Sequence, residues 1–259
     1  MGAERGMMTM GVSFEVFGCG IGGAEARMEE FGGVAVVGAA LETPPEGGEF
    51  FSSVVVPVGT TGTVAGEEES PTPFIVWVHD NDLDSLALPG RVEAEDFVMP
   101  CMALDLTTAD LDPASYAPPT ASPSADVAYP VVSVSMAEIG PLCASVYGDP
   151  AFDPVMAAMD DPRAQGWGIK NEDGSVVSAM VTIEYEGDVG VYCMATDPEW
   201  GSRGFGTRVL CAGLASAKAN GAVTASLQAS PQGERLYTRI GFVPAGSAHA
   251  FVPAAATAE

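Results

Sequence analysis

The chain has 259 residues, 47 % of them hydrophobic, which is enough apolar side chain to bury a core in one large domain or two modest ones. It carries 10 Lys and Arg against 35 Asp and Glu, a formal net charge of -25. Nucleic acids and anionic membranes are therefore excluded as expected partners, because basic side chains bind their phosphates. The sequence has neither a run of about 18 to 20 apolar residues nor a basic segment leading into an apolar one, so we expect no membrane span and no secretory signal.

Acidic residues are concentrated in the first half of the chain. Residues 1–129 hold 21 acids against 3 arginines, whereas residues 130–259 hold 14 acids against 7 bases. The second half is therefore the less repulsive one for an anionic ligand. The acidic excess as a whole is more typical of solubility or of a salty cytoplasm than of electrostatic steering.

In the first half, the pattern predicts a helix at 24–31 and strands at 50–58, 74–78 and 97–106. Residues 110–129 are rich in Pro, Ser, Ala and Asp without an apolar period, which predicts a linker. The linker would separate an acidic α/β region at 1–109 from a second domain at 130–259.

The second half has a clearer order of elements. We expect a strand at 131–134, helices at 136–147 and 151–159, and a hairpin of 167–170 and 175–185 around an acidic glycine turn. A strand at 189–196, a helix that stops at Asn220-Gly221, a strand at 223–227, a helix at 232–239 and a strand at 242–252 follow. This order predicts an α+β fold, mostly antiparallel, with one parallel crossover.

The two halves share a loose pattern. Three segments of the first half correspond to three of the second. Residues 73–78 match 222–228, Leu86 and Leu88 match 237–242, and a strand ending at 102–104 matches 248–252. The pattern suggests a decayed structural repeat. Unrelated strands of similar composition account for it equally well.

A glycine turn, 201–206, lies between the strand that ends at Asp197-Pro198 and a helix that begins near Thr207. A strand that runs into such a turn and then a helix leaves unpaired backbone N–H groups at the positive end of the helix dipole, which is an anion site. The turn lacks the third glycine of a dinucleotide fingerprint and the Gly-Lys-Ser/Thr of a P-loop.

Residues 130–252 resemble the GNAT superfamily of acyl-CoA-dependent N-acyltransferases. The family signature Arg/Gln-x-x-Gly-x-Gly/Ala falls on Gly201-Ser202-Arg203-Gly204-Phe205-Gly206, and the stretch Leu-Tyr-x-Arg/Lys-x-Gly-Phe is matched in full by 236–242. The resemblance implies a mixed, mostly antiparallel twisted sheet flanked by helices. It also makes the N-terminal half a candidate degenerate copy of the same fold.

The resemblance implies acetyl-CoA as co-substrate, without a metal. Backbone amides of the turn would bind its pyrophosphate, and a strand would pair with its pantetheine arm; the implied binding residues are Met194, Ala195, Thr196, Gly201, Ser202, Arg203, Gly204, Phe205, Gly206 and Thr207. Gly201 departs from the signature, which has Arg or Gln there, so CoA binding should be weakened more than abolished. Arg203 or Arg208 are candidates to supply the missing charge.

Tyr237 lies where many relatives place the phenol that protonates the departing thiolate, although a core tyrosine is the structural alternative. The strand glutamate that serves some relatives as general base corresponds to about Gly190. Glu184 is therefore the base candidate, with Glu186 and Asp188 beside it, and all three are typical of solvated strand or turn positions.

No other catalytic or metal-binding arrangement is indicated. His79 and His249 lack a second ligand at metal spacing, so we interpret both as structural or surface residues. The cysteines are odd in number and form no CxxC pair, which predicts neither disulfides nor a zinc site and fits a reducing cytoplasm; they are Cys19, Cys101, Cys143, Cys193 and Cys211.

The sequence thus predicts an N-acetyltransferase that moves an acetyl group directly to a primary amine, with Tyr237 as general acid. The acidic first half favours a cationic acceptor, a small molecule or a protein lysine, chosen by the loops between the first two helices and by the last strands. A non-catalytic acyl-CoA-binding module is the alternative. The oligomeric state is left open.

Overall fold

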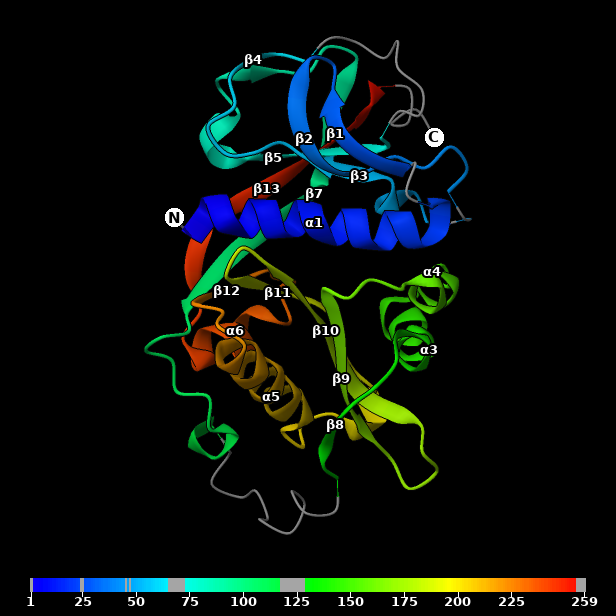
Figure 1. Cartoon of the computed structure of the whole chain (residues 1–259), viewed down its shortest axis with the longest axis vertical. Coiled ribbons are helices and arrows are strands. Elements are labelled where there is room, and N and C mark those ends of the chain that lie inside the picture. Colours follow the sequence, from blue (N-terminus) through cyan, green and yellow to red (C-terminus); the bar gives the residue numbers. More distant parts are fainter. Residues whose placement is uncertain are drawn as a thin grey trace.

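The protein is described by a computed structural model that covers residues 2–23, 26–44, 46, 48–64, 73–116 and 129–254. One large twisted sheet runs through both halves of the chain, with helices on both faces (Figure 1). Its strand order is β1-β2-β3-β5-β13-β7-β12-β11-β10-β9-β8. All neighbours in it are antiparallel except β3 with β5 and β11 with β12, so the predicted α+β, mostly antiparallel fold is confirmed.

The strands have the following bounds. The N-terminal half contributes β1 (Arg27–Phe31), β2 (Val34–Ala39), β3 (Ser53–Val55), β5 (Ile75–His79) and β7 (Arg91–Asp105), and a small separate sheet of β4 (Gly62–Thr63) and β6 (Leu86–Ala87). The C-terminal half contributes β8 (Val131–Ser133), β9 (Ala164–Lys170), β10 (Val176–Tyr185), β11 (Asp188–Thr196), β12 (Thr224–Gln228) and β13 (Val243–Pro253). Most predicted strands agree with these, although β7 begins earlier than expected and β2 lies where no strand is predicted. In the strand predicted at 50–58, only Ser53–Val55 is a strand, after a 3-10 helix at Glu49–Phe51.

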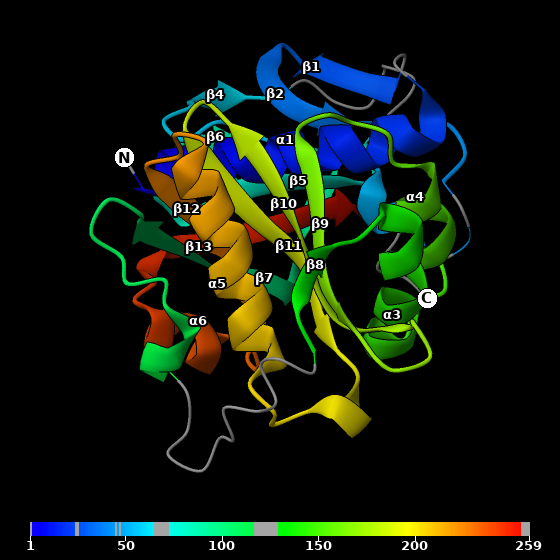
Figure 2. The same cartoon turned by 60° about the horizontal axis from the view of Figure 1, so that its bottom comes forward.

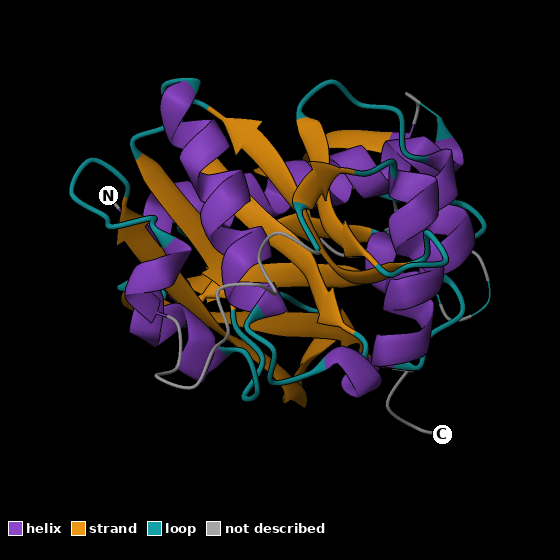
Figure 3. Ribbon diagram, turned by 90° about the horizontal axis from the view of Figure 1, so that it is seen from below, coloured by secondary structure: helices purple, strands orange, loops and turns teal. Residues whose placement is uncertain are grey.

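The helices of the C-terminal half lie where the sequence predicts them: α3 (Met136–Tyr147), α4 (Phe152–Ala158), α5 (Phe205–Ala219) and α6 (Glu234–Ile240). Ser135 and Glu138 form a capping box at the start of α3, and Gly148 ends it in the left-handed conformation, with φ 72°. Helices α5 and α6 cover one face of the sheet, whereas α3 and α4 cover the other (Figures 2 and 3).

A long helix that the sequence analysis did not predict, α1 (Gly2–Gly22), crosses the middle of the molecule on the same face as α3 and α4 (Figure 1). Glycine lowers helix propensity, and this segment is glycine-rich. The glycines allow close packing: a methyl group at Gly11 would lie 2.8 Å from Val37, and one at Gly6 would lie 3.3 Å from Ser226. Helix α1 therefore lies directly on strands of both halves. No helix in the described part of the chain is long and apolar enough to cross a lipid bilayer.

The helix predicted at 24–31 is wrong, because β1 occupies most of this segment. Phe31 pairs with Val34 across a two-residue turn, Gly32-Gly33, in which both residues have positive φ (58° and 81°). This is the conformation that a tight hairpin requires.

The last strand of each half pairs with the other half. In the order β5-β13-β7-β12, β13 lies between the N-terminal strands β5 and β7, while β7 lies against β12 of the C-terminal half. Two of the three matched pairs of segments fall on β5 with β12 and on β7 with β13, at equivalent positions on either side of the central β7–β13 pair. The third pair does not fit, because Leu86 lies on strand β6 whereas 237–242 begins within helix α6. The described residues between β3 and β5 include no helix. If the N-terminal half is a copy of the C-terminal fold, the described residues between these strands therefore do not include its copy of the glycine turn and α5.

The predicted linker has a short 3-10 helix at Pro113–Tyr116, and 117–128 lie outside the described residues.

Candidate functional site

The parallel strands β11 and β12 separate at the centre of the sheet. They pair only from Asp188 with Thr224 to Gly190 with Ser226, after which β11 continues to Thr196 and β12 to Gln228 without pairing to each other. The second half of β11 therefore has an edge that no strand of the described residues covers on this side. A free strand edge offers backbone N–H and C=O groups to an extended ligand.

A β-bulge interrupts β11 beside this edge. Ala195 pairs with Ala179 and Tyr192 with Val181, so Cys193 and Met194 together oppose a single residue of β10. Cys193 has φ 51°, which is unusual for a residue other than glycine. The bulge changes the direction of the backbone groups at this point.

Helix α3 fixes the two bulge carbonyls. The Tyr147 hydroxyl donates to the Met194 carbonyl at 2.9 Å, and the Cys143 thiol, one helical turn earlier, donates to the Cys193 carbonyl at 3.7 Å. Since C=O and N–H of a trans peptide point in opposite directions, the N–H groups of Met194 and Ala195 are directed away from α3.

The glycine turn forms the N-terminus of α5, as the sequence predicts. Ser202 and Gly204 both have positive φ (60° and 78°), and α5 begins at Phe205 without a side chain capping its N-terminus. The first N–H groups of a helix have no partner inside the helix, so those of Phe205, Gly206 and Thr207 are directed towards a ligand position in front of it. A methyl group at Gly206 would lie 3.2 Å from Met194 Cε, which shows how closely α5 approaches β11.

Three arginines surround this helix end. The Arg203 guanidinium lies 4.4 Å from the Trp200 ring centroid and donates to the Glu199 carbonyl at 3.2 Å. Arg208 donates to the Tyr129 carbonyl, behind the turn. The third, which the sequence analysis did not consider, is Arg239 of α6; it donates to Thr207 Oγ1 at 2.8 Å and brings positive charge to the first turn of α5.

A cavity of about 380 Å³ lies beside the separated strands. It is lined by the bulge residues of β11, Gln228 at the end of β12 and Ser230 after it, Tyr237 of α6, and side chains of α1, β7 and the α3–α4 region. The structure therefore brings Tyr237 and the bulge of β11 to one cavity.

The Tyr237 side chain is 6 % exposed and packs edge-on against Phe242, with ring centroids 5.8 Å apart. Burial raises the pKa of Tyr237 to about 12. The phenol is therefore neutral and a proton donor throughout the physiological range.

The position of the relatives' strand glutamate, Gly190, is covered by another side chain of β11. A methyl group there would meet the ring of Tyr192 and would lie 2.7 Å from Thr9 Cγ2 of α1. The Tyr192 hydroxyl is buried beside Ser13. Burial, and after it the charge of Asp188, raises the pKa of Tyr192 well above 10. A tyrosine, not a carboxylate, thus occupies this part of the site.

Asp188 is buried, at 2 % exposure, and not solvated as the sequence analysis expected. Its carboxylate accepts from the hydroxyls of Thr9 (2.7 Å), Thr224 (2.6 Å) and Ser226 (2.5 Å). These bonds satisfy a buried charge and tie α1 to the segment over which β11 and β12 are paired.

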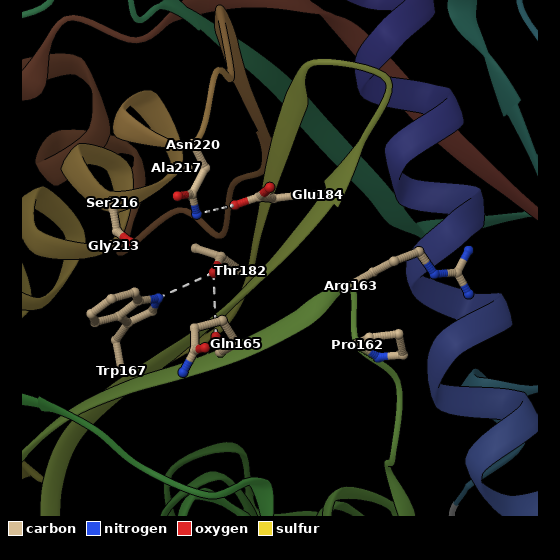
Figure 4. A pocket seen from close by; sticks show the side chains of 10 residues that line it. All are labelled: Pro162, Arg163, Gln165, Trp167, Thr182, Glu184, Gly213, Ser216, Ala217 and Asn220. Carbon is tan, nitrogen blue, oxygen red and sulfur yellow. Dashed lines mark hydrogen bonds between the residues drawn. The ribbon is translucent and has the colours of Figure 1, made fainter.

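The structure does not bring Glu184 to the cavity of Tyr237. Glu184 lines a smaller pocket of about 190 Å³ between β9, β10 and α5, where it faces Asn220 at 3.5 Å, next to Trp167 and Thr182 (Figure 4). Among the described residues that line the larger cavity, the carboxylate is Asp149, at the end of α3. Its Oδ1 accepts from the Ala151 N–H at 2.9 Å. No sequence motif marks this residue.

The two histidines have structural contacts outside the cavity. His79 is 1 % exposed and bonds Ala245 O through Nε2 at 2.9 Å, and His249 Nδ1 lies 2.7 Å from Glu93 Oε1. Within the described ranges, no group of three His, Cys, Asp or Glu side chains is placed to hold a metal ion.

The structure resembles solved N-acetyltransferases, while no protein-family model and no curated protein matches the sequence. A GCN5-related N-acetyltransferase from Kribbella flavida matches over 96 % of both chains, with 15 % identity and a TM-score of 0.59. A GNAT-family protein from Novosphingobium aromaticivorans matches 68 % of this chain and 72 % of its own, with 17 % identity and a TM-score of 0.47. The ribosomal-protein-S18-alanine N-acetyltransferase of Escherichia coli matches 48 % of this chain and 91 % of its own, with 14 % identity and a TM-score of 0.41.

The chain therefore has the fold of the GCN5-related N-acetyltransferases, as its motifs indicated. The likeness to the Kribbella protein extends over both halves of the chain.

Proposed function

We propose that the chain is an acyl-CoA-dependent N-acyltransferase, of class EC 2.3.1, which transfers the acetyl group of acetyl-CoA directly to a primary amine. One observation carries the proposal: the bulge of β11 and the Tyr237 phenol line the same cavity, and Met194 of this bulge lies 3.2 Å from the methyl position of Gly206 in the uncapped first turn of α5. These are the parts needed to hold a thioester and to protonate its leaving group.

Acetyl-CoA would bind mainly through backbone groups. The free edge of β11 at Met194, Ala195 and Thr196 would pair with the pantetheine amides, and the N–H groups of the turn and of the first turn of α5 would bind the pyrophosphate. In a chain of net charge -25, the positive end of α5 and the guanidinium of Arg239 provide local compensation for the anion.

In the reaction, the acceptor ammonium first loses one proton to water, and the neutral amine nitrogen then attacks the thioester carbonyl carbon. An N–H group of the bulge, at Met194 or Ala195, would stabilise the developing oxyanion. The C–S bond then breaks, the thiolate takes the Tyr237 proton, the amine nitrogen loses its proton to water, and the phenolate is reprotonated by solvent.

A phenol with a pKa of about 12 is a weak acid, but the surroundings also act on the thiolate. Burial disfavours the charged form of a thiol in the same way, so the pKa of the leaving group rises towards that of the phenol. The pKa values of the donor phenol and of the leaving thiol therefore lie closer together, which makes the proton transfer less unfavourable.

Two measurements test the proposal: calorimetric titration of the chain with acetyl-CoA, and thiol release from acetyl-CoA over a panel of primary amines. Binding together with amine-dependent thiol release supports an acyltransferase. If acetyl-CoA does not bind, the proposal is refuted.

The second candidate is a non-catalytic acyl-CoA-binding module. Gly201 lacks the side chain of the signature, and Tyr192 covers the site of a strand base at Gly190. Binding of acetyl-CoA without thiol release from any amine of the panel would favour this reading.

We also propose a reducing, cytoplasmic location and no nucleic-acid or membrane partner. The net charge of -25 opposes phosphate-rich surfaces, and the described cysteines are free; they are Cys101, Cys143, Cys193 and Cys211.

A further inference from the structure

The cavity of Tyr237 has a wall that comes from the N-terminal half of the chain. Phe14 and Phe17 of α1, Phe50 and Phe51 in the segment before β3, and Phe97 of β7 all line it. These rings lie in contact: the centroid of Phe50 is 5.2 Å from that of Phe14 and 6.1 Å from that of Phe97. The first half of the chain thus contributes an aromatic surface to the site of the second half.

The aromatic surface continues into the α3–α4 region. Phe51 lies 5.3 Å from Phe152, and Phe152 lies 5.0 Å from Tyr147, whose hydroxyl holds the bulge carbonyl of Met194. Tyr147 and Phe97 are 45 % and 44 % exposed, which places both at the cavity's border with solvent. The rings therefore extend from the bulge of β11 to solvent.

The charge in the cavity is limited. Of the described side chains that line it, one is ionisable as a carboxylate, Asp149, and none is a lysine or an arginine. One carboxylate together with aromatic faces suits one ammonium group. Each further ammonium of a polyamine or aminoglycoside would lose its hydration without a charged partner.

We infer that the acceptor is a hydrophobic primary amine with a single ammonium group and an aryl-sized apolar body. Asp149 would attract the ammonium, and the aromatic side chains of the N-terminal half would hold the body. A volume of about 380 Å³ lies within the range of about 300 to 1,000 Å³ of small-molecule sites. This inference rests on the proposed function, and it narrows the cationic acceptor that the acidic composition favours to one with a single charge.

Thiol release with saturating acetyl-CoA tests the preference among amines. We expect kcat/KM for 2-phenylethylamine to exceed that for n-propylamine and for spermidine by at least tenfold. A preference for spermidine would overturn the inference and leave the acyltransferase function intact.

Calorimetric titration with 2-phenylethylamine tests the cavity without turnover, with the chain loaded with free CoA and with the chain alone. We expect binding in both titrations. Absence of amine binding in both titrations overturns the inference. Failure of acetyl-CoA to bind refutes the proposed function instead, and the amine titration of the chain alone still tests the cavity.

Two pairs of variants locate the contact. Phe97→Ser should weaken 2-phenylethylamine binding at least fivefold, while Val98→Ser, on the opposite face of the same strand, should not. Asp149→Asn keeps an oxygen that accepts from the Ala151 N–H. It should weaken the binding of 2-phenylethylamine at least tenfold but leave the binding of 2-phenylethanol unchanged. Asp160→Asn, outside the cavity, is its control. Equal effects within either pair would overturn the inference.

Discussion

The Tyr192 hydroxyl lies directly over Gly190, 2.5 Å from the place where a methyl group at position 190 would stand. The absence of a side chain at Gly190 is therefore what admits the tyrosine ring, which packs under α1 beside Thr9. The two residues form one unit: a glutamate at 190 and a tyrosine at 192 could not share this space.

Gly190→Ala should accordingly destabilise the protein by about 1 to 3 kcal/mol, the usual cost of overpacking. Urea unfolding of Gly190→Ala, Tyr192→Val and the double variant gives the measurement. We expect the alanine to cost less in the Tyr192→Val background, because the ring is gone. Additive costs would show that the two positions do not interact.

Tyr237→Phe should lower kcat by about tenfold or more and change the affinity for acetyl-CoA little, since the ring remains and only the proton donor is lost. Because burial raises the pKa of Tyr237 to about 12, kcat of the unmodified enzyme should not fall between pH 8 and 10 from loss of this proton. Tyr185→Phe, at the end of β10 and outside the cavity, is the matched control. An unchanged kcat in Tyr237→Phe would remove the phenol from the mechanism.

Gly204→Asp should abolish acetyl-CoA binding. Apart from its chain neighbours, no atom of the described residues lies within 4 Å of the position of a methyl group at 204, so a carboxylate there would extend into the space in front of α5 and repel the pyrophosphate. Gly204→Asn places a neutral side chain on the same backbone, whose φ of 78° asparagine tolerates better than most residues. Calorimetry should show at least tenfold weaker binding for Asp than for Asn, and equal affinities would contradict an anion site.

Gly201→Arg should increase the affinity for acetyl-CoA about three- to tenfold by restoring a charge-assisted contact to phosphate. The backbone at Gly201 (φ -62°, ψ 162°) is open to any residue, and its methyl position lies 3.2 Å from the Pro198 carbonyl, which requires only a small shift. Gly201→Ala separates the effect of the backbone from that of the charge. If Arg and Ala bind acetyl-CoA equally well, the side chain at this position has no role in binding.

Stability should fall in alkaline solution. Burial raises the pKa of Cys101 and Cys211 from 9.0 to about 11 and that of Tyr237 from 10.0 to about 12. A group whose pKa is raised by folding contributes its full stability below the unfolded pKa and loses it as the pH approaches the folded pKa. The free energy of unfolding by urea should therefore be constant near pH 8 and lower by about 2 kcal/mol or more at pH 10.5. A constant value across this interval would show that these groups ionise as freely in the folded protein as in the unfolded chain.

The sequence predicted the C-terminal half well, because its turns and helix ends are marked by local chemistry. Ser135 with Glu138 begins α3, Gly241 ends α6, and the glycine turn begins α5, so each boundary is decided by a few neighbouring residues. The motif from Leu236 to Phe242 also placed Tyr237 on the correct short helix.

The N-terminal half and the acceptor side of the site depend on contacts between distant segments. Helix α1 is built around glycines that lower helix propensity and are explained only by the strands beneath them, such as Val37 under Gly11. The aromatic wall joins Phe50, Phe97 and Phe152, which no local pattern connects. Nearness in sequence to Gly190 predicts Glu184 as the general base, yet strand β10 directs the Glu184 side chain towards the end of α5.

Because β7 and β13 each complete the other half's part of the sheet, neither half of the chain holds all the strands that its own core requires. A break within 117–128 would leave two fragments, each lacking the strand that the other carries. We expect such fragments to aggregate when produced separately and to restore a folded complex only when produced together. The half that carries the glycine turn would then fold only together with the first half, which supplies both a neighbouring strand and one wall of the cavity.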